Sequence, residues 1–186
     1  MKRIDLAICG AFLLRPTVHS DHRGFFFESY HQERMQALGL RQPFVQDNHS
    51  RSLRGVLRGL HYQIRQPQGK LVRVVAGEVF DVAVDLRPTS PTFGKWLSAT
   101  LSAADMNQFY VPTGFAHGFL TLEPNVEVAY KVSNYYSKDH DCSLNWADRS
   151  LAIHWPLPAG AKPILSEKDV EAPGLSAIKR EIEAFR

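Results

Sequence analysis

Short strand-like segments follow one another along most of this sequence, and they limit the fold more than any other feature. Apolar, β-branched and aromatic residues are concentrated in segments 71–76, 79–86, 93–101, 108–119 and 126–136, with glycine and proline between or within them. About eight short strands at regular spacing, interrupted by turn residues, are typical of β-sandwiches and β-barrels. The pattern therefore predicts an all-β fold.

Local signals add the expected connections and helices. Residues 71–76 and 79–86 are expected to form a hairpin through a turn at Gly77 and Glu78. One surface helix is predicted over residues 29–38, with Ser29 as its N-cap and Gln32 at the capping-box position, and it should end at Gly39. A first strand is expected within residues 1–14, and an amphipathic helix is expected over residues 175–185.

The length and composition indicate one compact domain. The 186 residues would comprise an N-terminal strand and helix (1–42), a core (about 43–136) and a C-terminal cover (137–186). The net charge of +3 is scattered along the chain, which favours a phosphorylated small molecule over a nucleic acid as the partner. No apolar stretch approaches the ~20 residues that cross a bilayer. Two distant cysteines without a CxxC pattern argue against disulfides and structural zinc, and they favour the cytoplasm.

The segment VLRGLHYQ, residues 56–63, holds polar groups inside an otherwise apolar strand. Arg58, His61 and Gln63 occur within six positions, and Lys70 begins the next apolar run. Strict alternation would place Arg58 and His61 on opposite faces of the strand. Both can serve one pocket only if Gly59 carries a bulge, so we predict a break in the regular pairing there.

Two further segments offer groups for recognition. Residues 21–28 read DHRGFFFE, which sets Arg23 and Glu28 beside three phenylalanines. These aromatic residues could belong to the core or could recognise a planar base, and both readings stay open. In residues 44–50, parity places the amides of Gln46 and Asn48 on one face of a strand. The alternative for this second segment is a turn rich in Asx hydrogen bonds.

A metal site is not favoured, although residues 112–117 match half of the metal-binding pattern of cupin barrels. The other half requires a second histidine close to His61 and a carboxylate shortly beyond it. Neither occurs in residues 62–70. Two histidines, His61 and His117, make a poor set of ligands for zinc or iron, so we expect no metal.

The polar residues supply the groups for proton transfer next to a carbonyl. A histidine with a pKa near ~6.5 is a workable base at neutral pH, and a tyrosine with a pKa near ~10 is a proton donor. Lysine or histidine can stabilise the enolate oxygen. With the acid opposite the base, this set would serve an isomerase or epimerase.

Many of these motifs, in this order, resemble those of the dTDP-4-dehydrorhamnose 3,5-epimerase (RmlC) family. The matching segments are DHRGFFFE (21–28), VQDNHS (45–50), VLRGLH (56–61), GKLVR (69–73), VFDVAVD (79–85), SPTFG (90–94) and PTGFAHG (112–118). The resemblance implies a cupin-type jelly roll, usually a homodimer, that needs no cofactor. It also implies dTDP-4-dehydro-6-deoxy-D-glucose, a dTDP-4-keto-6-deoxyhexose, as the substrate.

By the family pattern, four residues carry the chemistry. His61 would remove the proton with Asp169 as its partner, and Tyr130 would return a proton from the other face. Lys70 would stabilise the enolate oxygen. Spacing alone leaves Asp81 and Asp85 as rival partners of His61, so the choice of Asp169 rests on the resemblance.

The same resemblance assigns residues to substrate binding: Arg23, Phe26, Glu28, Gln46, Asn48, Arg58, His117, Tyr136, Asp141 and Lys168. Tyr136 would stack on the thymine. The strand that carries Phe26 would reach the site of the neighbouring subunit. This chain departs from the usual pattern after its paired tyrosines, where it has Lys138 and Asp141 in place of a proline and a glutamate.

Three alternatives remain at this point. A single-centre epimerase, acting at C3 or C5 only, would share nearly the same residues. A non-catalytic sugar-nucleotide binding module could use the same barrel, because a fold does not determine a function. A metal-dependent cupin oxygenase or isomerase is the third, and bound metal in the purified protein would favour it.

Overall fold

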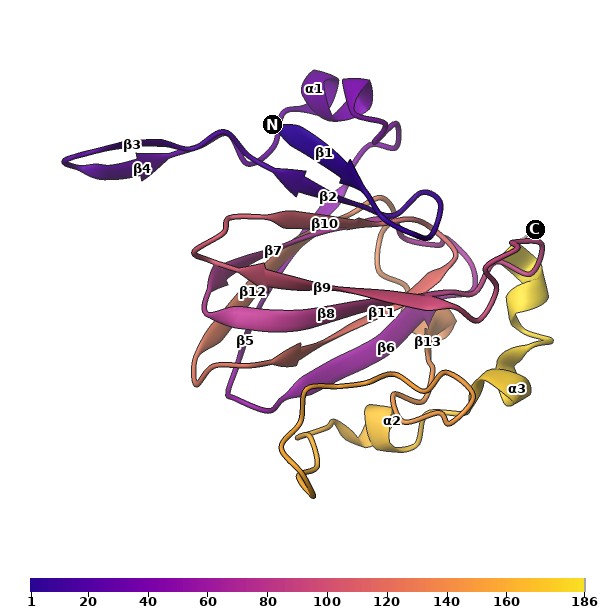
Figure 1. The fold of residues 1–186 in the computed structure, drawn as a ribbon. Coiled ribbons are helices and arrows are strands. Elements are labelled where there is room, and N and C mark those ends of the chain that lie inside the picture. Colours follow the sequence, from indigo (N-terminus) through magenta and orange to yellow (C-terminus); the bar gives the residue numbers. More distant parts are fainter. Residues whose placement is uncertain (186) are drawn as a thin grey trace.

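Two antiparallel β-sheets form the body of the protein (Figure 1). The computed structural model describes residues 1–185, and the side chains of residues 1–183. The first sheet has six strands, in the spatial order β1 (Lys2–Asp5), β2 (Phe12–Arg15), β10 (Gln108–Val111), β7 (Lys70–Ala76), β12 (Val126–Val132) and β5 (Gln46–Ser52). The second has five, in the order β13 (Asp141–Ser143), β6 (Leu57–Gln63), β11 (Phe115–Thr121), β8 (Glu78–Asp85) and β9 (Trp96–Ser102). This two-sheet architecture confirms the predicted all-β class.

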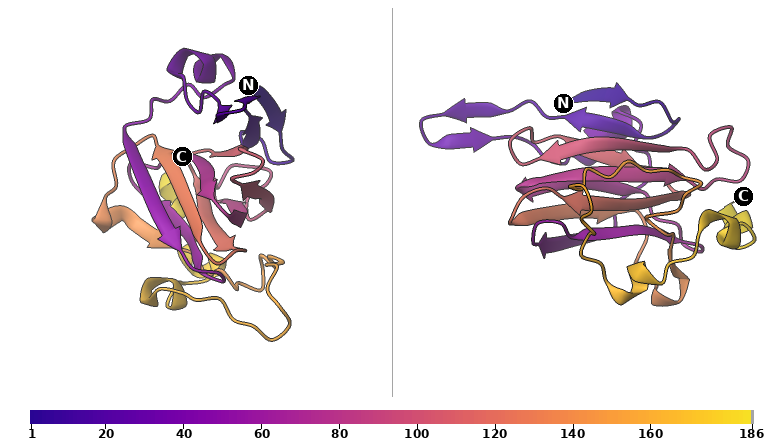
Figure 2. Two further views of the ribbon diagram at one scale, coloured as in Figure 1. Left: turned by 90° about the vertical axis from the view of Figure 1, so that its left-hand side faces the viewer. Right: turned by 60° about the horizontal axis from the view of Figure 1, so that its bottom comes forward.

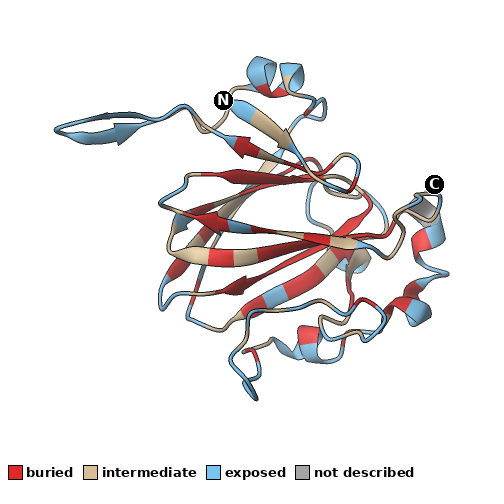
Figure 3. Ribbon diagram, viewed as in Figure 1, coloured by how far each residue is buried: buried red, intermediate tan, exposed pale blue. Residues whose placement is uncertain are grey.

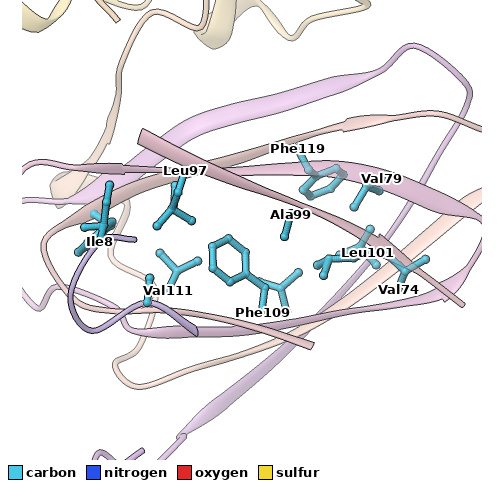
Figure 4. Close-up of a cluster of buried hydrophobic side chains, with 14 of the residues drawn as sticks. Ile8, Val74, Val79, Leu97, Ala99, Leu101, Phe109, Val111 and Phe119 are labelled. Carbon is cyan, nitrogen blue, oxygen red and sulfur yellow. The ribbon is translucent and has the colours of Figure 1, made fainter. Parts of the chain in front are cut away.

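The main hydrophobic core lies between the two sheets (Figure 4). Phe109 and Val74 come from the six-stranded sheet, and Leu101, Val79 and Phe119 from the five-stranded sheet. Phe109, Leu101 and Val79 are completely buried. Burying a large apolar side chain contributes about 1.5–3 kcal/mol, so this layer holds the two sheets face to face.

The expected hairpin of residues 71–76 and 79–86 was wrong. The two strands exist as β7 and β8, but β7 pairs with β10 and β12, while β8 pairs with β9 and β11. Gly77 between them has a φ of 76°, and a Cβ there would lie 2.9 Å from the carbonyl oxygen of Asn125. The turn carries the chain from one sheet to the other. Strands that follow each other in sequence usually pair, but here more distant pairings replace the local one.

The helices are few and short. The surface helix is α1 (Gln32–Ala37), which begins three residues later than expected, with His31 as an N-cap that makes no side-chain hydrogen bond. Ser29 does not cap it, because this residue lies in the extended approach, where its carbonyl oxygen accepts a hydrogen bond from Gln108 Nε2 at 2.9 Å. The helix ends before Gly39, as predicted, and Gly39 has a φ of 101°.

The C-terminal helix is divided into two pieces, α3 (Leu175–Ile178) and the 3-10 helix η2 (Ile182–Phe185). Its apolar periodicity is real, because Leu175, Ile178 and Ile182 are buried in a second core beneath the five-stranded sheet. A turn between the pieces lets each meet that core. Along the described part of the chain, no helix combines the length and apolar character needed to cross a membrane.

A two-stranded arm, β3 (His19–Asp21) and β4 (Gly24–Phe26), extends away from both sheets (Figures 1 and 2). Figure 3 shows the arm exposed along its length. Phe25 and Phe26 are 62% and 71% exposed. These two phenylalanines therefore do not belong to the core of this chain, and the recognition reading of the segment remains.

The C-terminal segment attaches to the strand that holds His61. The Leu57 amide donates to the Ile164 carbonyl oxygen at 3.0 Å, and the Ile164 amide donates to the Gly55 carbonyl oxygen at 2.8 Å. This short parallel bridge leads into α2 (Glu167–Val170), which lies beside β6 (Figure 1). The bridge thus brings Asp169 to the five-stranded sheet.

The predicted break at Gly59 is confirmed. On β11, His117 pairs with His61 and Phe119 pairs with Arg58, so one residue between the pairs on β11 opposes two on β6. The extra residue shifts the alternation. Arg58 and His61 can therefore serve the same side of the sheet.

We expect Gly59→Ala to reduce the free energy of unfolding by about 4 kcal/mol or more, among the largest effects of single substitutions. Gly59 has a φ of 135°, and an added Cβ would lie 2.5 Å from the Cα of Gly118, a backbone atom that cannot move aside alone. Urea denaturation measures the loss. Gly24→Ala is the matched control, because Gly24 has a φ of 129° with nothing within 4 Å of the added Cβ. Equal losses in the two variants would contradict the role of close packing.

Candidate active site

Polar side chains of the two sheets meet where Lys70 of the six-stranded sheet contacts His61 of the five-stranded sheet, and we call this place between the sheets the gap. His61 on β6 lies opposite His117 on β11 in the five-stranded sheet. In the six-stranded sheet, Tyr130 on β12 pairs with Val72 on β7, two residues from Lys70 and on the same face. The Lys70 ammonium reaches across the gap and donates to the His61 carbonyl oxygen at 3.4 Å. An imidazole, an amine and a phenol thus approach one space from opposite walls.

His61 forms a short hydrogen bond to a buried carboxylate. Its Nε2 lies 2.6 Å from Oδ1 of Asp169, which is 3% exposed. Ser166 Oγ donates to the other oxygen, Oδ2, at 2.8 Å. Burial raises the pKa of the Asp169 carboxyl, but the hydrogen bonds from His61 and Ser166 outweigh burial, so the pKa lies below its usual value. The charged carboxylate therefore fixes the orientation of the imidazole.

The rival carboxylates have other partners. Asp81 accepts a hydrogen bond from His117 Nε2 at 2.8 Å, and both side chains are buried. Burial raises the pKa of Asp81 and lowers that of His117. Asp85 accepts hydrogen bonds from Arg87, Ser90 and Thr92. Of the three carboxylates, Asp169 is the one that binds His61.

Lys70 is 8% exposed, and its surroundings make the ammonium easy to deprotonate. Burial lowers its pKa to about 8, although the negative charges of Asp141 and Asp81 act in the other direction. The amine is thus mostly protonated at neutral pH. Because its pKa lies near the working range, its charge can change within it.

Tyr130 keeps its proton at neutral pH. Burial raises the pKa of its phenol, and the charge of Asp141 adds to this effect, while the positive charge of Arg58 opposes it. Arg58 also donates to Ser52 Oγ at 3.0 Å. Arg58 of β6 thus contacts β5, the neighbour of β12 in the six-stranded sheet.

The residues assigned to the nucleotide form a connected group beside the gap. Gln46 Nε2 donates to Asn48 Oδ1 at 2.9 Å, and Gln46 Oε1 accepts from the Tyr136 amide at 2.9 Å. The Tyr136 hydroxyl donates to Asp141 Oδ2 at 3.1 Å, and Lys168 donates to the same oxygen at 2.5 Å. The Tyr136 side chain remains 55% exposed. Asp141 thus connects Tyr136 to Lys168, the neighbour of Asp169 in the chain.

Three of the assigned residues do not join the gap in this chain. Arg23 and Phe26 lie on the projecting arm, where Arg23 is paired with Asp21 at 2.6 Å (Figure 1). Glu28 follows the arm and accepts a hydrogen bond from Arg34 at 3.0 Å. Arg23 and Phe26 are thus carried away from the sheets that hold His61 and Tyr130.

Ser166 is a further residue of the site that the sequence motifs did not indicate. Its hydroxyl accepts a hydrogen bond from the Asp169 amide and donates one to the Asp169 carboxylate. A serine three residues before an acidic residue at the start of a helix is a capping signal that could have revealed it. Among the described residues, no group of three or more histidine, cysteine, aspartate or glutamate side chains is arranged to hold a metal ion.

Comparison with known proteins places residues 5–177 within the model of one family, dTDP-4-dehydrorhamnose 3,5-epimerase. A Pseudomonas aeruginosa enzyme of this name is 55% identical over 170 residues, which covers 91% of this chain and 93% of that protein.

Two solved structures inform the comparison further. The 3,5-epimerase RmlC of Legionella pneumophila, in complex with dTDP-4-keto-L-rhamnose, is 48% identical, with a TM-score of 0.94 over 97% of this chain and 96% of that one. ChmJ, a 3'-monoepimerase from Streptomyces bikiniensis in complex with dTDP-quinovose, is 38% identical, with a TM-score of 0.87 over 94% of this chain and 88% of that one.

Proposed function

The chain belongs to the dTDP-4-dehydrorhamnose 3,5-epimerase family, a family of isomerases, and we propose that it inverts both C3 and C5 of dTDP-4-dehydro-6-deoxy-D-glucose. The product is dTDP-4-dehydro-L-rhamnose. One observation carries the proposal: His61 belongs to the five-stranded sheet and Tyr130 to the six-stranded sheet, and Lys70, which shares a face with Tyr130, contacts His61. A sugar ring held in that gap has a base on one face and an acid on the other, which is the arrangement that inversion requires.

The 4-keto group of the substrate makes the protons on C3 and C5 acidic. His61 donates its Nε2–H to Asp169, which leaves the lone pair on Nδ1 to take the proton from carbon. The charged carboxylate then stabilises the imidazolium that forms. Tyr130 returns a proton to the opposite face of the carbon. Because the oxidation state does not change, the reaction needs no redox cofactor.

Lys70 stabilises the enolate that forms between the two proton transfers. Its ammonium is buried in the gap, where little water screens its charge from the developing oxyanion. The cation is held near His61, because Nζ donates to the His61 carbonyl oxygen. A positive charge fixed there favours the transition state more than the neutral ketone.

The activity is expected to fall as pH rises through about 8, the lowered pKa of Lys70. Below this pH the amine carries the charge that stabilises the enolate, and above it the charge is lost. The measurement is kcat/KM against pH, because this ratio reports the free enzyme. Lys70→Met should lower kcat/KM by about 10²-fold, and its pH profile should no longer fall near pH 8. If the fall in kcat/KM near pH 8 persisted in Lys70→Met, it would reflect the titration of another group.

The remaining assigned residues bind the nucleotide and sugar in this proposal. Tyr136 stacks on the thymine, with Gln46, Asn48, Arg58, His117, Asp141 and Lys168 around the substrate.

The enzyme is a homodimer in which Arg23, Phe26 and Glu28 reach the site of the neighbouring subunit. The exposure of Phe25 and Phe26 on an extended arm supports this, because large aromatic residues left in water commonly mark an interface. The free cysteines Cys9 and Cys142 fit a cytoplasmic location.

The decisive experiment is incubation with dTDP-4-dehydro-6-deoxy-D-glucose in deuterated water, followed by NMR of the C3 and C5 protons. Exchange at both centres with an L-configured product supports the double epimerase. Absence of exchange above that of a His61→Ala control would leave a sugar-nucleotide binding module.

A single-centre epimerase is the second candidate, supported by the similarity to the 3'-monoepimerase ChmJ. Action at both centres depends on how the ring is placed in the gap, where ångström differences have large effects. In the same experiment, deuterium at C3 alone or at C5 alone would select this candidate and leave the roles of His61 and Tyr130 unchanged.

A further inference from the structure

Gln63 is a buried amide that the proposed mechanism does not use. It lies on β6, two residues after His61, and is 4% exposed. Its Nε2 donates to the Gln66 carbonyl oxygen at 2.8 Å and to the Tyr135 carbonyl oxygen at 3.3 Å. Its Oε1 accepts from the Ser137 amide at 2.9 Å. Both ends of the side chain amide are thus bound to backbone groups.

Two of these contacts lie on either side of Tyr136. The Tyr135 carbonyl group and the Ser137 amide flank Tyr136 in the chain, so Gln63 holds the backbone before and after this residue. The segment 134–137 is not part of a strand or helix, and the Tyr135 and Tyr136 side chains are 66% and 55% exposed. Its conformation therefore depends on such side-chain contacts more than on a regular backbone ladder.

We propose that Gln63 is a positioning residue for the nucleotide, because it fixes the backbone on which the Tyr136 ring stands. The inference rests on the proposed function, in which Tyr136 stacks on the thymine. Through these hydrogen bonds, Gln63 connects β6, the strand that carries His61, to Tyr136, which binds the thymine. Gln63 itself does not need to touch the substrate.

Loss of this amide should weaken binding more than chemistry. Without the Gln63 amide, the Tyr136 ring has to be ordered when the nucleotide binds, and the conformational entropy lost in that ordering weakens binding. His61, Asp169 and Lys70 keep their own contacts in the gap. We expect Gln63→Ala to raise KM for the sugar nucleotide, and Kd for dTDP, by about 5–30-fold. The value of kcat should change by less than about 3-fold.

The experiment measures dTDP binding by isothermal titration calorimetry, together with kcat and KM, for Gln63→Ala and Gln63→Met. Gln68→Ala is the matched control. Gln68 Nε2 donates to the Asn134 carbonyl oxygen at 2.8 Å. Gln68→Ala therefore also removes a side-chain hydrogen bond to segment 134–137, but at a site farther from Tyr136. A thermal melt of each variant measures any loss of stability. A purely structural role would weaken binding in Gln68→Ala and Gln63→Ala equally, which would overturn the proposal.

A double-mutant cycle with Tyr136→Ala tests the route of the effect. If Gln63 acts through the Tyr136 ring, Gln63→Ala should weaken dTDP binding little further in the Tyr136→Ala background. Full additivity of the two losses would overturn the inference, as would a fall in kcat with unchanged KM. If the unchanged protein fails to bind dTDP, the proposed function itself fails. If it binds dTDP and the Gln63 variants bind equally well, only the positioning role fails.

Discussion

The His61→Asn variant is expected to lose epimerase activity by about 10³-fold or more. A positioned general base contributes about 10²–10⁴-fold to such a reaction. Asparagine can still donate a hydrogen bond towards Asp169, which lies 2.6 Å from the imidazole, but it cannot accept a proton from carbon. The variant should therefore fold and bind nucleotide while deuterium exchange at both C3 and C5 stops. NMR of the substrate in deuterated water measures both centres at once.

A graded series tests whether the carboxylate acts through the imidazole. Asp169→Asn should reduce kcat by about 10²-fold, because the imidazolium loses its charged partner. Ser166→Ala should reduce kcat by about 3–10-fold, because it removes one of the hydrogen bonds that hold the carboxylate.

The His61→Asn variant also has an outcome that would contradict the role of His61. If deuterium exchange continued in it at an unchanged rate, another group would have to remove the proton.

Tyr130→Phe is expected to separate proton exchange from inversion. The variant keeps the base and Lys70, so the proton still leaves the carbon and solvent deuterium replaces it. It lacks the phenol that delivers a proton to the opposite face. Formation of L-configured product should therefore fall by about 10²-fold or more, while exchange should fall by less than about 10-fold. The two rates are measured in one NMR experiment, from deuterium in the remaining substrate and from the product signals.

Tyr30→Phe serves as the matched control for this prediction. Tyr30 packs edge-to-face against Phe44, with ring centroids 5.7 Å apart, in the cluster beneath α1. A phenylalanine keeps this contact, so both rates should stay near those of the unchanged enzyme. Equal losses of exchange and inversion in Tyr130→Phe would mean that Tyr130 contributes to the first proton transfer and is not a separate acid.

The residue pattern predicted correctly those structural features that neighbouring residues determine. The strands, the end of α1 at Gly39 and the bulge at Gly59 all depend on alternation and on glycine conformations that neighbouring residues reveal. The start of α1 was misplaced, because Ser29 is held by Gln108, which lies 79 positions away. Residue type alone could not assign the phenylalanines of the arm, since apolar residues suit a core and an interface equally well.

The sequence by itself determined the all-β class, the segments that become strands and the polar groups available for proton transfer. These follow from residue types and short-range periodicity. Only the tertiary structure decided that β7 and β8 enter different sheets. Residue spacing left Asp169, 108 positions from His61, and Asp81 as alternative partners for it. The family resemblance favoured Asp169, and the structure shows that Asp169 binds His61 while Asp81 binds His117. Residue types make each pairing chemically feasible, but which groups meet depends on how the two sheets and the C-terminal segment pack together. That packing sums many long-range contacts that no single stretch of sequence contains.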